Sequence, residues 1–169
     1  MDFINEFVMF LLQMQSKYSM LMLQIYFPGR LIDMIKVMIG EKGTGKTKIL
    51  IDSINKTANS ANGNVVFIGN DTKRHMYDLD HKVRMVCTSE FDIGDYSEFY
   101  GFICGIISNN FDITDVYIDS IFKIVNNKME GLEVFFKQVE KLTKEFDISF
   151  FFTISMDPVN APGYLIKYA

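Results

Sequence analysis

The fold is decided by the stretch Gly40-Glu41-Lys42-Gly43-Thr44-Gly45-Lys46-Thr47. It fits the pattern G-x-x-x-x-G-K-[ST] at every required position. Glycines in such a loop let backbone N–H groups surround phosphate oxygens, and the helix that follows points its positive end at them. We expect Lys46 to reach the β- and γ-phosphates and the Thr47 hydroxyl to hold a Mg²⁺ ion. The loop and Lys48, the next residue, are therefore predicted to bind a nucleoside triphosphate.

The residues on both sides of the loop supply the context that this motif requires. Residues 34–39 form an apolar run of strand length. Residues 46–59 have apolar side chains close to helical spacing, at Ile49, Leu50, Ile51, Ile54 and Ala58. A strand, a glycine-rich loop and a helix in this order favour a nucleotide site over the alternative, a glycine-rich turn that holds no ligand.

Composition indicates one globular domain. The chain has 169 residues, of which 49% are apolar and 22% charged. Its net charge of −4 provides no overall positive field for nucleic acid or anionic lipid, so no nucleic-acid patch is evident from the composition, and local patches stay open. Cys87 and Cys104 match no zinc spacing and are expected to be buried thiols in a reducing cytosol, which predicts a cytoplasmic location.

Residues 1–33 differ from the rest of the chain. Their apolar runs at 7–12 and 20–23 are interrupted by polar residues, so neither is expected to span a bilayer, and a signal peptide fits poorly. Three interpretations stay open: an amphipathic helix that packs on the domain or on a partner, a peripheral membrane anchor, or a misassigned translation start. We favour the last, because GGG-AGG can encode residues 29–30 and contains a bacterial ribosome-binding sequence upstream of Met34. The nucleotide-binding domain is then 34–169.

Further strand and helix patterns follow the loop. We predict strands at 65–68, 82–87, 115–120 and 148–155, and helices at 96–109, 129–145 and 162–168. Asp95 and Glu98 form a capping box. Gly101 and Gly105 are one turn apart and allow a neighbour to approach closely; packing on the sheet is favoured over the alternative, a dimer contact. Alternating strands and helices predict an α/β fold, a three-layer αβα sandwich with a mostly parallel sheet. Ligands bind at the carboxyl edge of such sheets, where we expect the glycine-rich loop, Asp71, Asp119 and Ser155.

A second motif lies at the strand that ends in Asp119. A carboxylate at a strand tip downstream of a phosphate-binding loop is the Walker B pattern, which binds Mg²⁺ directly or through water. Such an Asp is often an ordinary strand end, but the loop makes Asp119 the best candidate. Two predicted strands lie between the two motifs in sequence, which favours the additional-strand division of P-loop proteins.

With these motifs, residues 34–155 resemble the RecA/KaiC-like ATPase core of the P-loop NTPase superfamily. The Walker B strand of that family often ends Asp-Ser, as Asp119-Ser120 does. Its catalytic carboxylate lies just past the second strand, so the resemblance implies that Asp71 polarises the attacking water. The family normally has Glu there, and a helix or turn cap is the alternative for Asp71. The chain is also similar to small uncharacterised ATP-binding proteins of Firmicutes, which implies no activity.

The family also places a polar residue that senses the γ-phosphate at the end of a later strand. Thr153 or Ser155 stands there in this chain, and neither is the usual Gln or Asn. Arginine is scarce, which leaves Arg74 and Arg84 as candidate arginine fingers within the domain.

The expected function is Mg-dependent ATP binding with slow hydrolysis, in which Lys46, Asp71 and Asp119 are catalytic. The scarcity of arginine suggests that full activity needs a homo-oligomer or a protein partner. One alternative is a nucleoside or nucleotide kinase that holds its acceptor at residues 71–82. Another is a non-hydrolysing interaction module that responds to nucleotide. A GTPase is disfavoured because residues 126–129 lack the Asp of the N-K-x-D motif.

Overall fold

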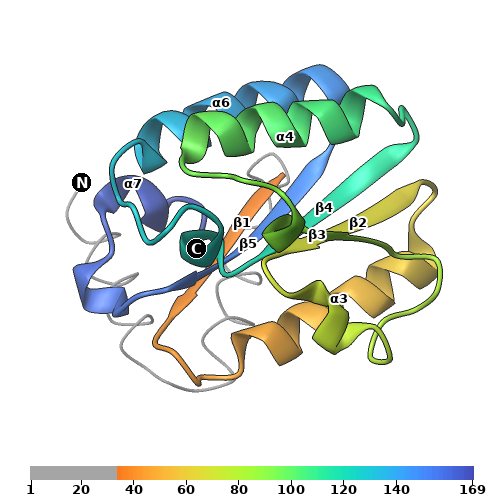
Figure 1. The fold of residues 1–169 in the computed structure, drawn as a ribbon, viewed down its shortest axis with the longest axis horizontal. Helices are drawn as coiled ribbons and strands as arrows, with labels where there is room; N and C mark the ends of the chain where they lie inside the picture. Colours follow the sequence, from red (N-terminus) through yellow and green to blue (C-terminus); the bar gives the residue numbers. More distant parts are fainter. Residues whose placement is uncertain (1–33) are drawn as a thin grey trace, which may run out of the picture. The chain divides into compact units, whose positions relative to one another are not determined.

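A five-stranded parallel sheet runs through the part of the chain that the computed structural model describes, residues 34–169 (Figure 1). The strands lie across the sheet in the order β1 (Ile35–Gly40), β5 (Ser149–Ser155), β4 (Ile113–Asp119), β2 (Asn64–Gly69) and β3 (Arg84–Cys87). Every neighbouring pair is parallel, which confirms the expected sheet and makes it wholly parallel among the described strands. The three interpretations of residues 1–33 lie outside the described residues.

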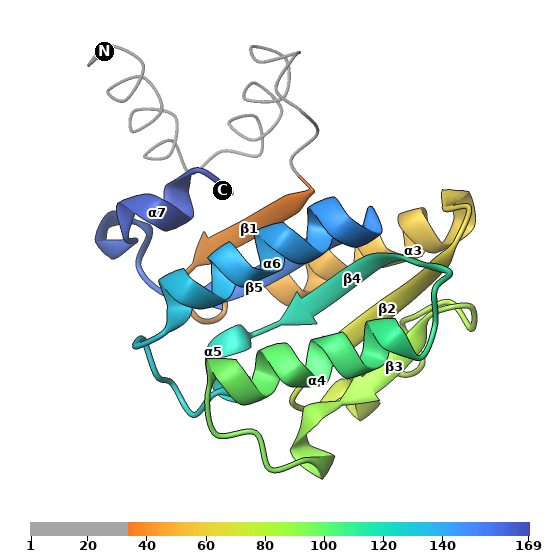
Figure 2. The ribbon, with the colours of Figure 1, turned by 90° about the horizontal axis from the view of Figure 1, so that it is seen from above.

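Helices flank both faces of this sheet. α4 (Tyr96–Ser108) and α6 (Leu132–Phe146) lie side by side on one face, and α3 (Lys46–Ser60) lies on the other (Figures 1 and 2). Shorter helical segments lie between or after the strands: η1 (Thr72–His75), η2 (Thr88–Glu90) and α5 (Ile121–Ile124) between them, and η3 (Pro158–Asn160) and α7 (Gly163–Ile166) after β5. The arrangement is an α/β fold in layers, as predicted from the alternation of strands and helices.

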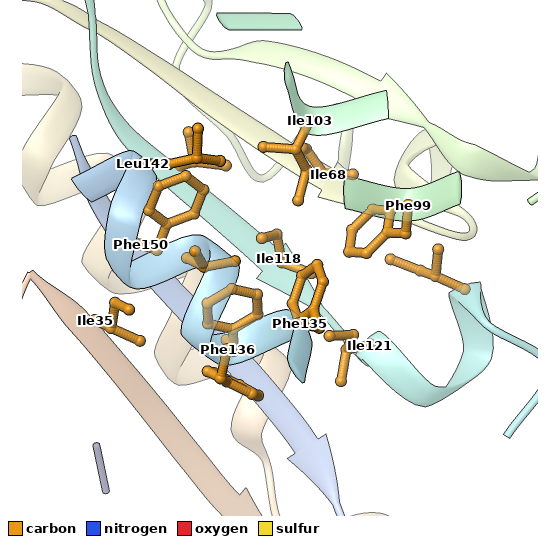
Figure 3. Packing of buried hydrophobic residues seen from close by; sticks show 14 of the residues in the cluster. Ile35, Ile68, Phe99, Ile103, Ile118, Ile121, Phe135, Phe136, Leu142 and Phe150 are labelled. Atoms are coloured by element: carbon orange, nitrogen blue, oxygen red, sulfur yellow. The ribbon is translucent and has the colours of Figure 1, made fainter. Parts of the chain in front are cut away.

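The larger part of the core lies between the sheet and the helices α4 and α6 (Figure 3). Aromatic rings dominate it: Phe135 stacks on Phe99 with ring centroids 5.6 Å apart, and Phe136 meets Phe152 at 5.0 Å. Each fully buried ring stabilises the fold by about 1.5–3 kcal/mol relative to an exposed one. A smaller cluster on the opposite face joins α3 to β2 and β4, chiefly through Leu50, Ile54, Val65, Phe67 and Tyr117.

Two local expectations on α4 need correction. Asp95 accepts hydrogen bonds from the backbone of Ser97 and Glu98, as a capping residue should, but the Glu98 carboxylate accepts from Gly94 N instead of Asp95 N. Gly101 and Gly105 do not pack on the sheet: both are exposed, and no neighbouring atom lies within 4 Å of where their Cβ would be. The buried face of α4 contains Phe99 and Ile103. Gly101 and Gly105 each come two residues after one of these positions, which in an α-helix places them on the opposite side.

The parallel strands bring their carboxyl ends to one edge of the sheet. In the register of the sheet Gly40 of β1 is opposite Ser155 of β5, and Gly69 of β2 is opposite Asp119 of β4. Asp71 comes two residues after the end of β2. The predicted gathering of the glycine-rich loop, Asp71, Asp119 and Ser155 at this edge is therefore confirmed.

Candidate functional site

The glycine-rich loop, residues 40–47, connects β1 to α3. Gly43 and Gly45 have φ of 88° and 82°, a left-handed conformation that strains any residue with a Cβ. Thr44 stabilises the loop from within, since its backbone N and its hydroxyl both donate to the carbonyl of Glu41. The N-terminus of α3 has neither a side-chain cap nor an acidic residue in its first turn. No acidic residue of α3 itself compensates its positive end, which suits an anion in the loop.

Lys46 is folded back over this loop. Its side chain is buried, and Nζ donates to the carbonyl oxygens of Gly40 and Glu41, both at 2.7 Å, and to the Thr44 hydroxyl at 3.3 Å. Burial lowers the pKa of Lys46, and the negative charge of Asp119 opposes this shift. The ammonium group is thus held beside the loop by neutral oxygen atoms, which an anionic phosphate oxygen could replace with a stronger, charge-assisted bond.

Thr47 and Asp119 meet although they are far apart in sequence. The Thr47 hydroxyl donates to Asp119 Oδ1 at 3.2 Å. A hydroxyl and a carboxylate oxygen are hard ligands of the kind Mg²⁺ takes, so these two residues fit the predicted metal site. No cluster of three or more His, Cys, Asp or Glu side chains suited to a metal occurs in residues 34–169. Mg²⁺ needs no such cluster, because it commonly takes one or two protein oxygens together with water and substrate phosphates.

Hydroxyl groups surround the Asp119 carboxylate. Thr153 Oγ1 donates to Oδ1 at 2.7 Å, and Ser120 Oγ donates to Oδ2 at 3.2 Å. The Thr153 hydroxyl also accepts from Ser120 N at 2.7 Å. On sequence Thr153 is predicted only to sense the γ-phosphate, and its contact with Asp119 is not predictable from the resemblance. The signal that could have revealed this contact is that Thr153 carries the one hydroxyl within the apolar run 150–154 of β5, since a buried hydroxyl needs a polar partner.

Asp71 lies at the same edge of the sheet but has a different partner. It precedes η1, and its half-exposed carboxylate forms an ion pair with the largely exposed Arg74. The structure therefore brings Lys46, Thr47 and Asp119 together, whereas Asp71 contacts none of them through a hydrogen bond. Arg84 begins β3 and is opposite Val66, about 10 Å from the carboxyl edge at the rise of a strand. Arg84 is thus a poor candidate for an arginine finger in this site.

A groove continues from the site along α3. It has a volume of about 380 Å³ and is lined by Thr47, Lys48, Ile51, Asp52, Asn55, His75 and Asp78. Asn55 links α3 to the segment that forms the other side of the groove: its amide donates to the carbonyl of Asp78 at 2.8 Å and accepts from Asp80 N at 2.9 Å. A larger hollow of about 540 Å³ opens at the opposite end of α3, around Ala58 to Val65, and contains no predicted site residue.

The two cysteines are not buried as predicted. Cys87 and Cys104 are both free and partly exposed. Cys87 ends β3, and a hydrogen bond from Ser89 lowers the pKa of its thiol. Cys104 lies on α4 and packs against the aromatic core. It is partly exposed to solvent because it lies beside the buried face of the helix and not within it.

No protein-family model matches the chain, and no curated protein matches it. Among the helices of residues 34–169, none combines the length and the hydropathy that a membrane crossing requires.

Proposed function

We propose that this protein binds a nucleoside triphosphate together with Mg²⁺ and hydrolyses ATP slowly. The observation that carries the proposal is the meeting of Lys46, Thr47 and Asp119 at a loop whose glycines adopt left-handed conformations. The backbone amides of the loop would hold the phosphates and Lys46 would neutralise their charge. The bound Mg²⁺ would neutralise the phosphate oxygens further, with Thr47 and Asp119 as its protein ligands.

The strand order supports a relationship to RecA-like ATPases. β5 lies between β1, which leads into the glycine-rich loop, and β4, which ends in Asp119. An inserted strand at this position is what the additional-strand division of P-loop proteins requires. Kinship with the RecA/KaiC-like core is therefore part of the proposal.

The proposal of slow hydrolysis rests on the scarcity of arginine. Asp71 is the acid predicted to activate the attacking water, and Arg74 is the candidate arginine finger at this edge. In the structure these two residues pair with each other in an exposed ion pair that costs little to break. Either residue would have to leave the other to act on the nucleotide. A partner or a second copy that supplies an arginine would then raise the rate, which keeps an oligomer or a protein partner in the proposal.

The groove beside Thr47 favours a second candidate function, phosphoryl transfer to an acceptor. It begins at the proposed Mg²⁺ ligand and has carboxylates and an imidazole in its wall, which suit an acceptor with hydroxyl groups. A nucleoside or nucleotide kinase would place its acceptor there. The third candidate is an interaction module that responds to nucleotide without hydrolysis. Only the absence of turnover distinguishes it from the other two candidates.

The decisive experiment measures ATP and GTP binding by calorimetry with and without Mg²⁺, and phosphate release under the same conditions. Asp119→Asn is expected to abolish the gain in affinity that Mg²⁺ brings. Asp115→Asn is its matched control, because Asp115 lies on the same strand near the opposite edge of the sheet. Absence of nucleotide binding to the wild-type protein, or equal Mg²⁺ dependence in Asp119→Asn, would refute the proposed site.

Turnover distinguishes the three candidates. Asp71→Asn is expected to abolish phosphate release and leave nucleotide binding intact if the protein is an ATPase. ADP formation that requires an added nucleoside or nucleotide, with the phosphoryl group recovered on that acceptor and no inorganic phosphate released, would favour the kinase. Binding with no turnover in any condition would favour the interaction module.

A further inference from the structure

Thr153 is a fully buried polar residue in the middle of an apolar strand. Its neighbours in β5 are Phe152 and Ile154, and its own exposed fraction is 0%. Both hydrogen-bonding capacities of its hydroxyl are engaged: it donates to Asp119 Oδ1 and accepts from Ser120 N, each at 2.7 Å. Both contacts reach across to the tip of the neighbouring strand β4.

The tip of β4 needs this support on its β5 side, because the pairing of β4 with β5 ends just before it, although Gly69 of β2 is still paired with Asp119. The last paired residues of β4 and β5 are Ile118 and Phe152. Beyond them Ser120 adopts φ 54° and ψ 55°, a left-handed conformation that is unfavourable for a residue with a Cβ. The backbone N–H of Ser120 has left the ladder, and the Thr153 hydroxyl replaces the missing acceptor.

The same hydroxyl orients the carboxylate. Asp119 Oδ1 accepts hydrogen bonds from the hydroxyls of Thr153 on β5 and Thr47 on α3, so two donors from different elements hold the side chain. Outer hydrogen bonds of this kind fix the orientation of metal-ligating carboxylates. The single proton of Thr153 is used on Asp119 and is therefore not available to a γ-phosphate oxygen in this arrangement.

We infer that Thr153 is a positioning residue that holds Asp119 and Ser120 in the geometry needed to bind the nucleotide-associated Mg²⁺. This inference rests on the proposed function. It assigns Thr153 an indirect role: the residue acts on the metal through Asp119 instead of sensing the γ-phosphate itself. Nucleotide binding without Mg²⁺, which depends on the glycine-rich loop and Lys46, does not require it.

The test compares Thr153→Val, which keeps the shape and removes the hydroxyl, with Thr153→Ser, which keeps the hydroxyl. Nucleotide affinity is measured in EDTA and across a Mg²⁺ titration. Thr153→Val is expected to require about tenfold more Mg²⁺ for half-saturation, the loss typical when the outer partner of a metal ligand is removed. Its affinity in EDTA is expected to equal that of the wild type, and Thr153→Ser to restore the Mg²⁺ dependence.

The matched control is Thr143→Val. Thr143 is also buried, but its hydroxyl donates to the carbonyl of Glu140 on α6, away from the site. This control is expected to bind Mg²⁺ and nucleotide as the wild type does. Circular dichroism and melting temperature establish that each variant is folded, and Thr153→Ala serves as the hydroxyl-free variant if valine prevents folding.

Two results would overturn the inference: a folded, hydroxyl-free variant with wild-type Mg²⁺ dependence, or equal losses of affinity in EDTA and in Mg²⁺, which would indicate a purely structural role. Failure of the proposed function is distinguishable from either. It would appear as a wild-type protein whose nucleotide binding is absent or does not respond to Mg²⁺.

Discussion

Replacing Lys46 by methionine tests whether its buried ammonium group serves a ligand or the fold. Methionine keeps most of the buried side-chain volume and removes the charge. Both carbonyl acceptors of Nζ retain another donor: Met156 N for Gly40 at 3.1 Å, and the Thr44 hydroxyl for Glu41 at 2.8 Å. The lost bonds are further offset because the buried charge, whose pKa is lowered by burial, no longer has to be desolvated. We expect the free energy of unfolding to change by less than about 1 kcal/mol.

The effect on nucleotide affinity should be much larger. A hydrogen bond from a charged group contributes about 1.5–3 kcal/mol, and Lys46 is proposed to reach two phosphate groups. Two bonds at the lower end give about 3 kcal/mol, which corresponds to a loss of roughly 100-fold in affinity. The variant should thus be nearly as stable as the wild type and almost unable to bind ATP.

Urea denaturation and calorimetric ATP titration measure the two effects on the same samples. Lys56→Met is the matched control, because Lys56 is exposed on the same helix and the change in charge is identical. It should leave both quantities unchanged. The reasoning is refuted if Lys46→Met binds ATP like the control, or if it loses several kcal/mol of stability, since Lys46 would then serve the loop and not a ligand.

The lowered pKa of Lys46 adds a pH dependence to this experiment. A bound triphosphate favours the charged ammonium and so raises its pKa, which means that binding takes up a proton above the pKa of the free protein. ATP affinity should therefore fall as the pH rises through the lowered pKa. Lys46→Met should lose this part of the pH profile.

Three further predictions concern the loop, the core and the C-terminal contacts. Gly45→Ala should lower the free energy of unfolding by about 1 kcal/mol in urea titrations, because its φ of 82° strains a Cβ even though space is available; an unchanged midpoint would contradict this. Phe135→Ala should cost about 3–5 kcal/mol, since the ring is fully buried among aromatic neighbours, and a cost below 1 kcal/mol would contradict the packing. A hydrogen bond from Lys167 lowers the pKa of Glu140 from 4.5, so the ionised carboxylate stabilises the fold above pH 4.5, and this stabilisation is lost as the pH falls through the lowered pKa. Glu140→Gln should therefore have a lower free energy of unfolding than the wild type, by under about 1 kcal/mol, only above pH 4.5. A difference that does not change with pH would contradict the assignment.

Much of the fold could be predicted because its signals are local. The pattern of residues 40–47 and the apolar runs around it predicted β1, the loop and α3 to within a residue or two. The sequence likewise predicted a helix at 129–145, where the structure has α6 (Leu132–Phe146). Parallel strands then required their carboxyl ends to share one edge, which placed Asp119 near the loop.

The features that sequence reasoning missed depend on contacts between distant segments. The partner of Thr153 is decided by how β5 lies beside β4, and no local pattern encodes that contact. The ion pair of Asp71 with Arg74 depends on a single turn, η1, which is too short to leave a periodic signal. Gly101 and Gly105 were misjudged because their spacing resembles a packing motif, whereas the larger apolar residues of α4 decide which face is buried.

The position of β1 at the edge of the sheet has a consequence for biosynthesis. Among the described strands β1 pairs only with β5. Ile35 can therefore pair within the sheet only after Phe150 has been synthesised. Chains emerge from the ribosome amino end first, and closing so long a loop is slow. The nascent chain should therefore lack an ordered glycine-rich loop until the last described strand has been translated, and the proposed nucleotide binding, measured on stalled ribosomes, would report the moment at which β5 has paired with β1.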